Sequence, residues 1–231
     1  MKNKIKIAVI GIGLMGSQHL KAIKISKKAT LHSIVDINEN SRLHAKKFNV
    51  PFYKTSKELL KNNKPDAVVI ATPNQFHENH TSYFLKSRIP VLLEKPISDN
   101  IQSAKKIIDN SKKNKTQLLI GYHRRHNSIV STVKKKIDSG QLGKIVSATV
   151  MCWLYKHKEY YKEKWRIKKG GGPLGINLVH DLDLICYLLG PVKYVQATTS
   201  NLIRKYEVED TAIVNLVFIS GSLCTLNISD T

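Results

Sequence analysis

A glycine-rich turn after an apolar run constrains this chain more than any other feature. The run from Ile5 to Ile10 is rich in β-branched residues, which is typical of a strand buried on both faces of a parallel sheet. Gly11, Gly13 and Gly16 follow it, and a helix is expected to begin among them. In this pattern the first glycine allows a tight turn, the second allows a phosphate to approach, and the third lets the helix pack on the strand. Free N–H groups and the positive dipole end at the helix N-terminus favour an anion there.

An acidic residue stands at the distance that this pattern requires. Asp36 ends a second apolar run (Leu31, Ile34, Val35) and lies twenty residues after Gly16. Its carboxylate can accept hydrogen bonds from the ribose 2′-hydroxyl of NAD and would repel the 2′-phosphate of NADP. A purely structural glycine turn is the alternative. The strand, the helix and the acidic partner together favour a dinucleotide site that prefers NAD over NADP.

Length and cysteine usage bound the class of protein. A chain of 231 residues can form one large or two small domains. Its apolar runs are too short to span a membrane and its basic start passes straight into the first strand, so we expect neither a signal peptide nor a spanning helix. Cys152, Cys186 and Cys224 lack a C-x-x-C spacing and stand in apolar contexts. They are typical of reduced core residues in a cytoplasmic protein.

The net charge of +21 raises the question of an anionic partner. Only six of the 38 basic residues are arginine, and the lysines are scattered in twos and threes. Base readout relies on bidentate arginine, and phosphate-binding grooves usually cluster their charge. We therefore interpret the charge as solvated surface and expect no nucleic-acid or membrane partner. A nucleic-acid binder stays an alternative, which a strongly salt-dependent affinity would reveal.

Strand and helix patterns continue to alternate beyond Asp36. Residues 41–48 are predicted to be helical, Phe52 and Tyr53 to form a short strand, and residues 66–71 to form a buried strand. Thr55 is the expected N-cap of a helix that has Glu58 three residues later. This alternation predicts an α/β fold with a doubly wound parallel sheet.

Two loops stand where strands of this sheet end, which is where ligands bind in such folds. The first, residues 72–77, reads Thr-Pro-Asn-Gln-Phe-His and can also be a plain proline turn that starts a helix. The second follows Val91–Leu93 and reads Glu94-Lys95-Pro96. A charge at the end of an apolar strand is costly unless it has a partner or a task.

The segments GIGLMGSQH, ATPNQFH and LLEKPIS, in this order and spacing, resemble the glucose-fructose oxidoreductase, inositol dehydrogenase and MocA family of NAD(P)-dependent oxidoreductases. The resemblance continues through GYHRRHN, the dipeptide WR and GGGPLGINLVHDLDLICYLLG, so it covers essentially the whole chain. It implies a Rossmann domain over residues 1–122. An α+β domain for substrate binding and oligomerisation, with a mostly antiparallel sheet, is implied over residues 123–231.

The residue patterns agree with this change from a Rossmann domain to an α+β domain. Residues 127–139 form a helical pattern that ends at Gly140, and residues 177–189 form a second one. Longer strands are predicted in the same region. They cover residues 144–154, 194–204, 211–218 and 223–228.

The resemblance also implies the residues of the site. The cofactor contacts would come from Gly11, Gly13, Leu14, Met15, Gly16, Asp36, Thr72, Pro73, Asn74, His77, Glu94 and Lys95. The substrate contacts would come from Arg124, Trp165, Arg166, Asn177 and His180. No metal is expected, and surface ion pairing is the alternative for the two arginines.

Lys95 and His180 are the catalytic candidates that the resemblance implies, for oxidation of a secondary alcohol of a sugar, sugar derivative or cyclitol. Hydride transfer needs a base for the hydroxyl proton and a positive charge near the oxygen. By itself His180 also fits a structural histidine, with Asp183 three residues later on one helix face. Inositol-dehydrogenase-like members carry an Asp four residues before this histidine, where this chain has Ile176. A catalytically silent dinucleotide-binding relative therefore stays the alternative.

Members of this family continue beyond the point that matches residues 229–231. We therefore expect an incomplete second domain whose last strand, residues 223–228, lies uncovered at a sheet edge. Such a chain would bind NAD but aggregate easily and turn over poorly. The homo-oligomer that is typical of the family would then be in doubt.

Overall fold

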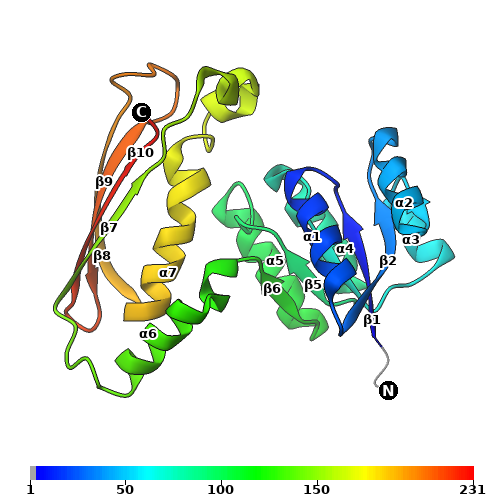
Figure 1. Ribbon diagram of the computed structural model, residues 1–231, viewed down its shortest axis with the longest axis horizontal. Helices are drawn as coiled ribbons and strands as arrows, with labels where there is room; N and C mark the ends of the chain where they lie inside the picture. The colour runs from blue at the N-terminus through cyan, green and yellow to red at the C-terminus, as the bar shows by residue number, and fades with distance from the viewer. Residues whose placement is uncertain (1–3) are drawn as a thin grey trace. The chain divides into compact units, whose positions relative to one another are not determined.

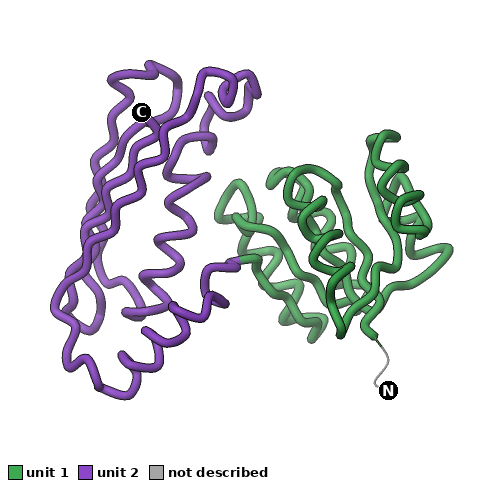
Figure 2. Tube along the Cα trace, viewed as in Figure 1, with its two compact units in different colours: residues 1–121 green, residues 122–231 purple. Residues whose placement is uncertain are grey.

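A computed structural model of the chain describes residues 4–231, which form two compact units. The first unit ends at Gly121 and the second begins at Tyr122 (Figure 2). Each unit has its own sheet and its own apolar core.

The first unit is built on a six-stranded sheet in which every pair of neighbours is parallel. The strands are β1 (Ile5–Ile10), β2 (Ala29–Val35), β3 (Phe52–Tyr53), β4 (Ala67–Ile70), β5 (Val91–Leu93) and β6 (Leu118–Ile120). Their order is β3-β2-β1-β4-β5-β6, so the chain runs outward from β1 on one side and from β4 on the other. This is the order of a Rossmann fold, and it confirms the predicted doubly wound sheet.

Helices cover both faces of this sheet (Figure 1). They are α1 (Leu14–Ile25), α2 (Arg42–Phe48), α3 (Ser56–Asn62), α4 (His77–Lys86) and α5 (Ile101–Asn114). Side chains of β1 alternate between the faces: Ala8 and Ile10 pack in the core formed with α3, α4 and α5, whereas Val9 packs in the core formed with α1 and α2. Burial on both faces explains the apolar residues 7–10 of β1, whereas Ile5 and Lys6 before them are exposed.

The predicted N-cap of α3 is confirmed. The Thr55 hydroxyl oxygen accepts a hydrogen bond from the Glu58 backbone N–H at 3.1 Å. The Glu58 carboxylate in turn accepts from the Lys54 N–H at 3.0 Å. The helix predicted over residues 41–48 has a 3₁₀ turn (Glu39–Ser41) in front of it, and α2 begins one residue later than predicted.

The second unit contains a four-stranded sheet in the order β7-β10-β9-β8. Its strands are β7 (Ser147–Trp153), β8 (Val192–Ser200), β9 (Thr211–Phe218) and β10 (Leu223–Ser229). β9 pairs antiparallel with β8 and with β10, while β10 pairs parallel with β7. The predicted mostly antiparallel second sheet is confirmed.

Two helices, α6 (Ser128–Asp138) and α7 (Val179–Leu189), lie on one side of this sheet (Figure 1). Val214 of β9 and Leu226 of β10 are buried in one cluster with Ile185 of α7. Side chains on the opposite face of the sheet stay exposed, among them Met151 and Ile213. The sheet is therefore covered on one face only, as its alternating pattern indicates.

The expectation that the last strand lies at a sheet edge is wrong. β10 is hydrogen-bonded to β7 along one side and to β9 along the other, so it lies inside the sheet. α7 covers the face that carries Leu226 and Ile228. A parallel partner can come from a distant part of the chain, and for this reason the order of strands in the sequence is no guide to their order in the sheet.

The strand predicted over residues 194–204 ends earlier, at Ser200. The chain turns there because the Asp210 carboxylate accepts hydrogen bonds from the N–H groups of Ile203 and Arg204, both at 2.9 Å. These two donors are thereby removed from the strand ladder.

The three cysteines are free, and all three pack in the core of the second unit. This agrees with their prediction as reduced core residues. No helix within residues 4–231 has the length and apolar character needed to cross a membrane.

Replacement of Leu226 by alanine tests the core of the second unit. Leu226 is fully buried, so Leu226→Ala should lower the free energy of unfolding by about 2–5 kcal/mol through lost burial and a residual cavity. Thr225→Ala on the exposed face of the same strand should cost less than about 1 kcal/mol. Urea unfolding followed by circular dichroism measures both, and equal losses would contradict the assignment of the two faces.

Candidate active site

The glycine turn after β1 has the geometry of a phosphate-binding loop. Gly11 has a φ of +86°, and a Cβ on Gly16 would lie 2.0 Å from the Gly11 carbonyl oxygen, so α1 packs directly against the turn. A Cβ on Gly13 would meet nothing within 4 Å, which leaves open space at the start of α1. Gly13 caps this helix without a side-chain hydrogen bond. The N–H groups of the first turn of α1 are therefore suited to hold a pyrophosphate.

Asp36 is held beside this turn. Its Oδ2 accepts a hydrogen bond from the Ile12 N–H at 2.6 Å and one from the Ser41 hydroxyl at 3.1 Å. Its Oδ1 accepts from the Asn38 N–H at 2.8 Å. Three donors thus fix the carboxylate at the end of β2, where the pattern places the ribose of a dinucleotide.

Arg42 at the start of α2 and Lys54 after β3 share one carboxylate. The Arg42 Nε donates to the Glu39 carboxylate at 3.0 Å, and the guanidinium lies 4.7 Å from the centre of the Phe52 ring. Lys54 forms an ion pair with the same carboxylate at 2.7 Å.

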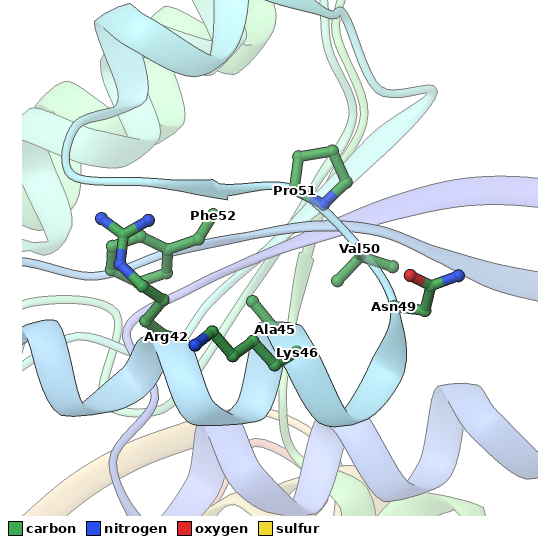
Figure 3. A pocket seen from close by; sticks show the side chains of 7 residues that line it. All are labelled: Arg42, Ala45, Lys46, Asn49, Val50, Pro51 and Phe52. Atoms are coloured by element: carbon green, nitrogen blue, oxygen red, sulfur yellow. The ribbon is translucent and has the colours of Figure 1, made fainter.

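A surface hollow of about 380 Å³ lies between α2 and the start of β3. Figure 3 shows Arg42 beside Phe52 in this hollow, together with Ala45, Lys46, Asn49, Val50 and Pro51. The predicted cofactor residues stand instead at the carboxyl ends of the strands, and none of them lines the hollow.

His77 joins the two loops that were predicted to carry the cofactor. Its ring is 1% exposed, and its Nε2 lies 2.9 Å from the Thr72 carbonyl oxygen while its Nδ1 lies 2.9 Å from that of Pro96. The loop after β4 contains a 3₁₀ turn (Asn74–Phe76). Through the two contacts of His77, this loop is held against the loop after β5. Membership of His77 in the cofactor site stays a prediction, and its ring is placed to support the loops.

Glu94, at the end of β5, is paired with a residue of α1. Its Oε1 lies 2.7 Å from the His19 Nε2, and its Oε2 accepts from the Lys95 N–H at 3.3 Å. Burial alone would raise the pKa of this carboxyl, but the hydrogen bond and charge of His19, together with the N–H and charge of Lys95, outweigh burial and hold the pKa below its usual value. Glu94 thus has the partner that a charge at the end of an apolar strand requires, and Lys95 follows it directly in a half-buried position.

Two ion pairs tie a 3₁₀ turn (His123–His126) to α7 in the second unit. Arg124 donates to the Asp181 carboxylate, and the Arg125 Nε donates to Asp183 at 2.7 Å. The anchoring of Arg124 matches the ion-pairing alternative, and its contact with substrate stays a prediction. The expected contact of Asp183 with His180 also stays a prediction.

His180 lies in the first turn of α7, half-buried, with its ring centre 5.3 Å from that of His123. The helix predicted from residue 177 begins differently, because a π-helical turn (Leu174–Leu178) precedes α7. Asn177 is part of this turn. Such turns recur at functional sites of helices.

Trp165 and Arg166 lie together in another 3₁₀ turn (Lys164–Ile167). The Arg166 guanidinium lies 3.9 Å from the centre of the Tyr160 ring and donates to the Tyr160 carbonyl oxygen at 2.8 Å. The Trp165 side chain is 52% exposed, so an apolar surface is available. Arg166, like Arg124, has a structural partner.

The glycine run that follows this turn permits a close approach. A Cβ on Gly172 would lie 2.2 Å from the Glu209 carboxylate, which accepts a hydrogen bond from the Leu174 N–H at 3.0 Å. Glu209 thereby holds the start of the π turn.

Two family models match the sequence and together cover most of it. Residues 5–122 match the model described as oxidoreductase family, NAD-binding Rossmann fold, and residues 130–231 match the GFO/IDH/MocA C-terminal domain. The chain belongs to the GFO/IDH/MocA family.

Relatives within the GFO/IDH/MocA family include two curated dehydrogenases. The chain is 30% identical to the myo-inositol 2-dehydrogenase of Thermotoga maritima over 228 residues, which are 94% of this chain and 66% of the relative. It is 28% identical to the glucose-6-phosphate 3-dehydrogenase of Bacillus subtilis over 188 residues, or 79% and 53% of the two chains. The chain thus spans about half to two thirds of the length of these relatives.

A solved structure of the GFO/IDH/MocA fold agrees with both units. The WlbA dehydrogenase of Bordetella pertussis, solved with NADH and UDP-GlcNAcA, has a TM-score of 0.92 and 27% identity to this chain. The similarity covers 99% of this chain and 67% of that one.

In the first unit, the predicted cofactor residues of this GFO/IDH/MocA chain lie on the glycine turn, at the start of α1 and next to the carboxyl ends of β2, β4 and β5. Asp36 joins the glycine turn, and Leu14 and Met15 begin α1 with exposed side chains. Pro73 and Asn74 share the loop that His77 supports. Sequence reasoning missed His19 as the partner of Glu94 and His123 as the neighbour of His180. His123 stands in the GYHRRHN segment and His19 ends the GIGLMGSQH segment, so both lie in motifs that the sequence pointed to, but neither motif named the partner.

The Glu94–His19 pair predicts a pH dependence of stability. Because the folded pKa of Glu94 is lowered, the carboxylate contributes stability above the unfolded pKa and loses it as the pH falls through the folded value. Glu94→Gln should therefore lower the free energy of unfolding by about 1 kcal/mol at neutral pH. This difference should decrease as the pH falls below the unfolded pKa of about 4.3 and should be lost once the pH lies below the lowered folded pKa.

Urea unfolding of both proteins from pH 7 to pH 3 measures this difference. Asp109→Asn, at an exposed carboxylate on α5 of the same unit, is the matched control and should change little at any pH. A difference between the wild type and Glu94→Gln that stayed the same over this whole pH range would contradict the role assigned to the pair.

Proposed function

We propose that the protein is a cytoplasmic, NAD-dependent oxidoreductase that transfers a hydride between the nicotinamide and a secondary alcohol of a sugar, sugar derivative or cyclitol. The main support is the Asp36 carboxylate, fixed by three donors beside a glycine turn whose helix start is open to an anion. The names of the relatives, which act on inositol and on glucose 6-phosphate, support the substrate class.

The proposed chemistry divides between two side chains. The bound nicotinamide would accept the hydride from the carbinol carbon. The Lys95 ammonium would hold the substrate hydroxyl and stabilise negative charge that develops on its oxygen. The His180 imidazole would take the hydroxyl proton, since imidazole changes its charge near neutral pH. Glu94, held by His19, would keep the Lys95 backbone in place.

Residues of the second unit would shape the substrate pocket. The exposed face of Trp165 can support a sugar-like ring through its apolar surface. Asn177 offers an amide for a substrate hydroxyl, because both its donor and acceptor atoms suit hydroxyl groups. Arg124 already binds Asp181, and Arg166 already binds the Tyr160 carbonyl oxygen. Each would contact substrate only through its remaining N–H groups.

The alternative is a relative that binds the dinucleotide without turning it over. Ile176 favours this alternative, because inositol-dehydrogenase-like members have an Asp at that position. A panel of myo-inositol, glucose 6-phosphate, alkyl glucosides and UDP-sugar acids with NAD separates the two, followed by nicotinamide absorbance. Reduction of NAD with one of them supports the enzyme, and calorimetric NAD binding without reduction supports the silent relative.

Cofactor choice tests the assignment of Asp36. NAD should bind at least about tenfold more tightly than NADP. The partly buried Asp36 carboxylate would accept a hydrogen bond from the ribose 2′-hydroxyl of NAD and would repel the 2′-phosphate of NADP. Asp36→Asn should weaken NAD binding and reduce the preference. Calorimetric titration with both cofactors measures this.

The control for Asp36 is another aspartate that binds a backbone N–H. Asp66→Asn alters a carboxylate that accepts from the Lys6 N–H at 2.8 Å, away from the glycine turn, and should leave both affinities unchanged. Tighter binding of NADP than of NAD by the wild type would overturn the assignment.

Substitution of the two proposed catalytic residues tests the chemistry. Lys95→Met and His180→Ala should each lower turnover by roughly two to four orders of magnitude while NAD binding stays nearly intact, as expected for lost acid–base assistance. Steady-state rates and NAD titrations measure the two effects. A variant that retained more than about a tenth of the wild-type turnover would exclude its residue from the proton-transfer step.

A further inference from the structure

The ring of His123 stands against the ring of the proposed base. The two ring centres are 5.3 Å apart and the ring planes are inclined by 68°. His123 is exposed to solvent, whereas His180 is half-buried. We infer that His123 is a positioning residue for proton transfer, and that its charge keeps the His180 imidazole in the neutral, proton-accepting form. This inference rests on the proposed function for its catalytic meaning.

The fold holds the two rings together through neighbouring ion pairs. Arg124 and Arg125 directly follow His123, and they bind Asp181 and Asp183, which follow His180 on α7. The side chains of Asp181 and Asp183 are only 14% and 9% exposed, so water screens these pairs less than it screens pairs on an open surface. The turn that carries His123 is thereby fixed to the first turns of α7.

Other titratable and charged groups on the turn, on α7 and on neighbouring elements are Tyr122, Arg124, Arg125 and His126 on the turn, Asp181, Asp183, Cys186 and Tyr187 on α7, Lys134 on α6, Cys152 on β7 and Glu209 at the π turn. Apart from His126, these groups are neutral or keep a constant charge near neutral pH. Each aspartate on α7 is neutralised by one arginine, and Lys134 is paired with Asp138 on its own helix.

The neutral groups among them stay neutral. Burial, followed by the charge of Asp183, raises the pKa of Tyr122. Burial, with a smaller effect of Asp181, raises the pKa of the Cys152 thiol, and burial also raises that of Cys186. The histidines are therefore the groups here whose charge changes between about pH 5 and 8.

Two like charges at this separation repel each other. The pair consequently takes up its two protons in separate steps. A proton on the His123 ring would lie about 5 Å from the His180 ring, and this positive charge disfavours a second proton on His180. His180 thus stays able to accept the substrate proton at lower pH than it could alone.

The test is an NMR titration of the histidine ring protons in the 231-residue chain without ligand, with His180→Ala to assign the signal. His123→Gln removes the charge and should move the titration of His180 up by about one pH unit. His123→Lys keeps a cation at this position and should leave the His180 titration at or below its wild-type midpoint. His126→Gln changes an exposed histidine of the same turn and is the matched control.

The outcomes separate charge from structure. An upward shift in His123→Gln that is absent in His123→Lys and His126→Gln supports the inference. An unmoved titration in His123→Gln, or an equal shift in His126→Gln, overturns it. Circular dichroism checks the fold, and His123→Asn replaces the glutamine variant if that one does not fold.

Activity gives a second readout that distinguishes this inference from the proposed function. If a member of the substrate panel is oxidised, the acid limb of kcat/KM should move to higher pH by the same amount in His123→Gln. Turnover with an unmoved limb and an unmoved titration contradicts the ring-pair inference alone. A shifted titration without turnover of any panel member supports the ring pair and contradicts the proposed function alone.

Discussion

The first unit depends on how closely α1 approaches the turn after β1. The Gly11 carbonyl oxygen occupies the place where a Cβ of Gly16 would stand, so a larger residue there would push the helix away from the strand. The same contact aims the N-terminus of α1 at the end of the sheet where β1 and β4 diverge in strand order. Packing and anion binding therefore depend on one pair of glycines, and the rest of the sheet supports their position.

In the second unit, charge pairing fixes a turn to a helix. The turn that carries His123 and Arg124 meets α7 through half-exposed guanidinium groups on largely buried carboxylates. A buried carboxylate without its arginine would be costly, so the turn and the helix stabilise each other in one arrangement. This pairing also brings two imidazoles into contact. A structural interaction thus sets the surroundings of the proposed base.

The sequence predicts what local patterns encode and fails where distant segments pair. The apolar run of β1 and the capping by Thr55 are local signals, and both predictions were confirmed in the structure. The acidic residue after β2 is a third local signal. Its carboxylate lies beside the glycine turn, and its contact with the ribose stays a prediction. The position of β10 inside the sheet depends on a parallel partner far away in the chain. No local pattern encodes that pairing, which is why its prediction as an edge strand failed.

Side-chain pairs that join distant residues were likewise not predicted from the sequence. Residues 75 apart in the chain form the His19–Glu94 pair, and residues 57 apart form the Arg124–Asp181 pair. Spacing along one helix suggested Asp183 as a neighbour of His180 but gave no sign of Arg125, which binds Asp183 in the structure. Charged residues choose partners by position in space, so a sequence can identify a charged residue in an apolar segment without identifying what neutralises it.

The orientation of α7 follows from its apolar face, and this face determines where the proposed base stands. Leu178 and Ile185 are buried in the core against the sheet and lie about two turns apart on one side of the helix. His180 follows Leu178 by two positions, which places it about 200° around the helix axis and so away from the sheet. The π turn before α7 ends at Leu178 and sets the rotation at which the helix starts. Burial of these two aliphatic side chains therefore turns His180 toward the turn that carries His123. The hydrophobic core thus positions the imidazole without contacting the reacting groups.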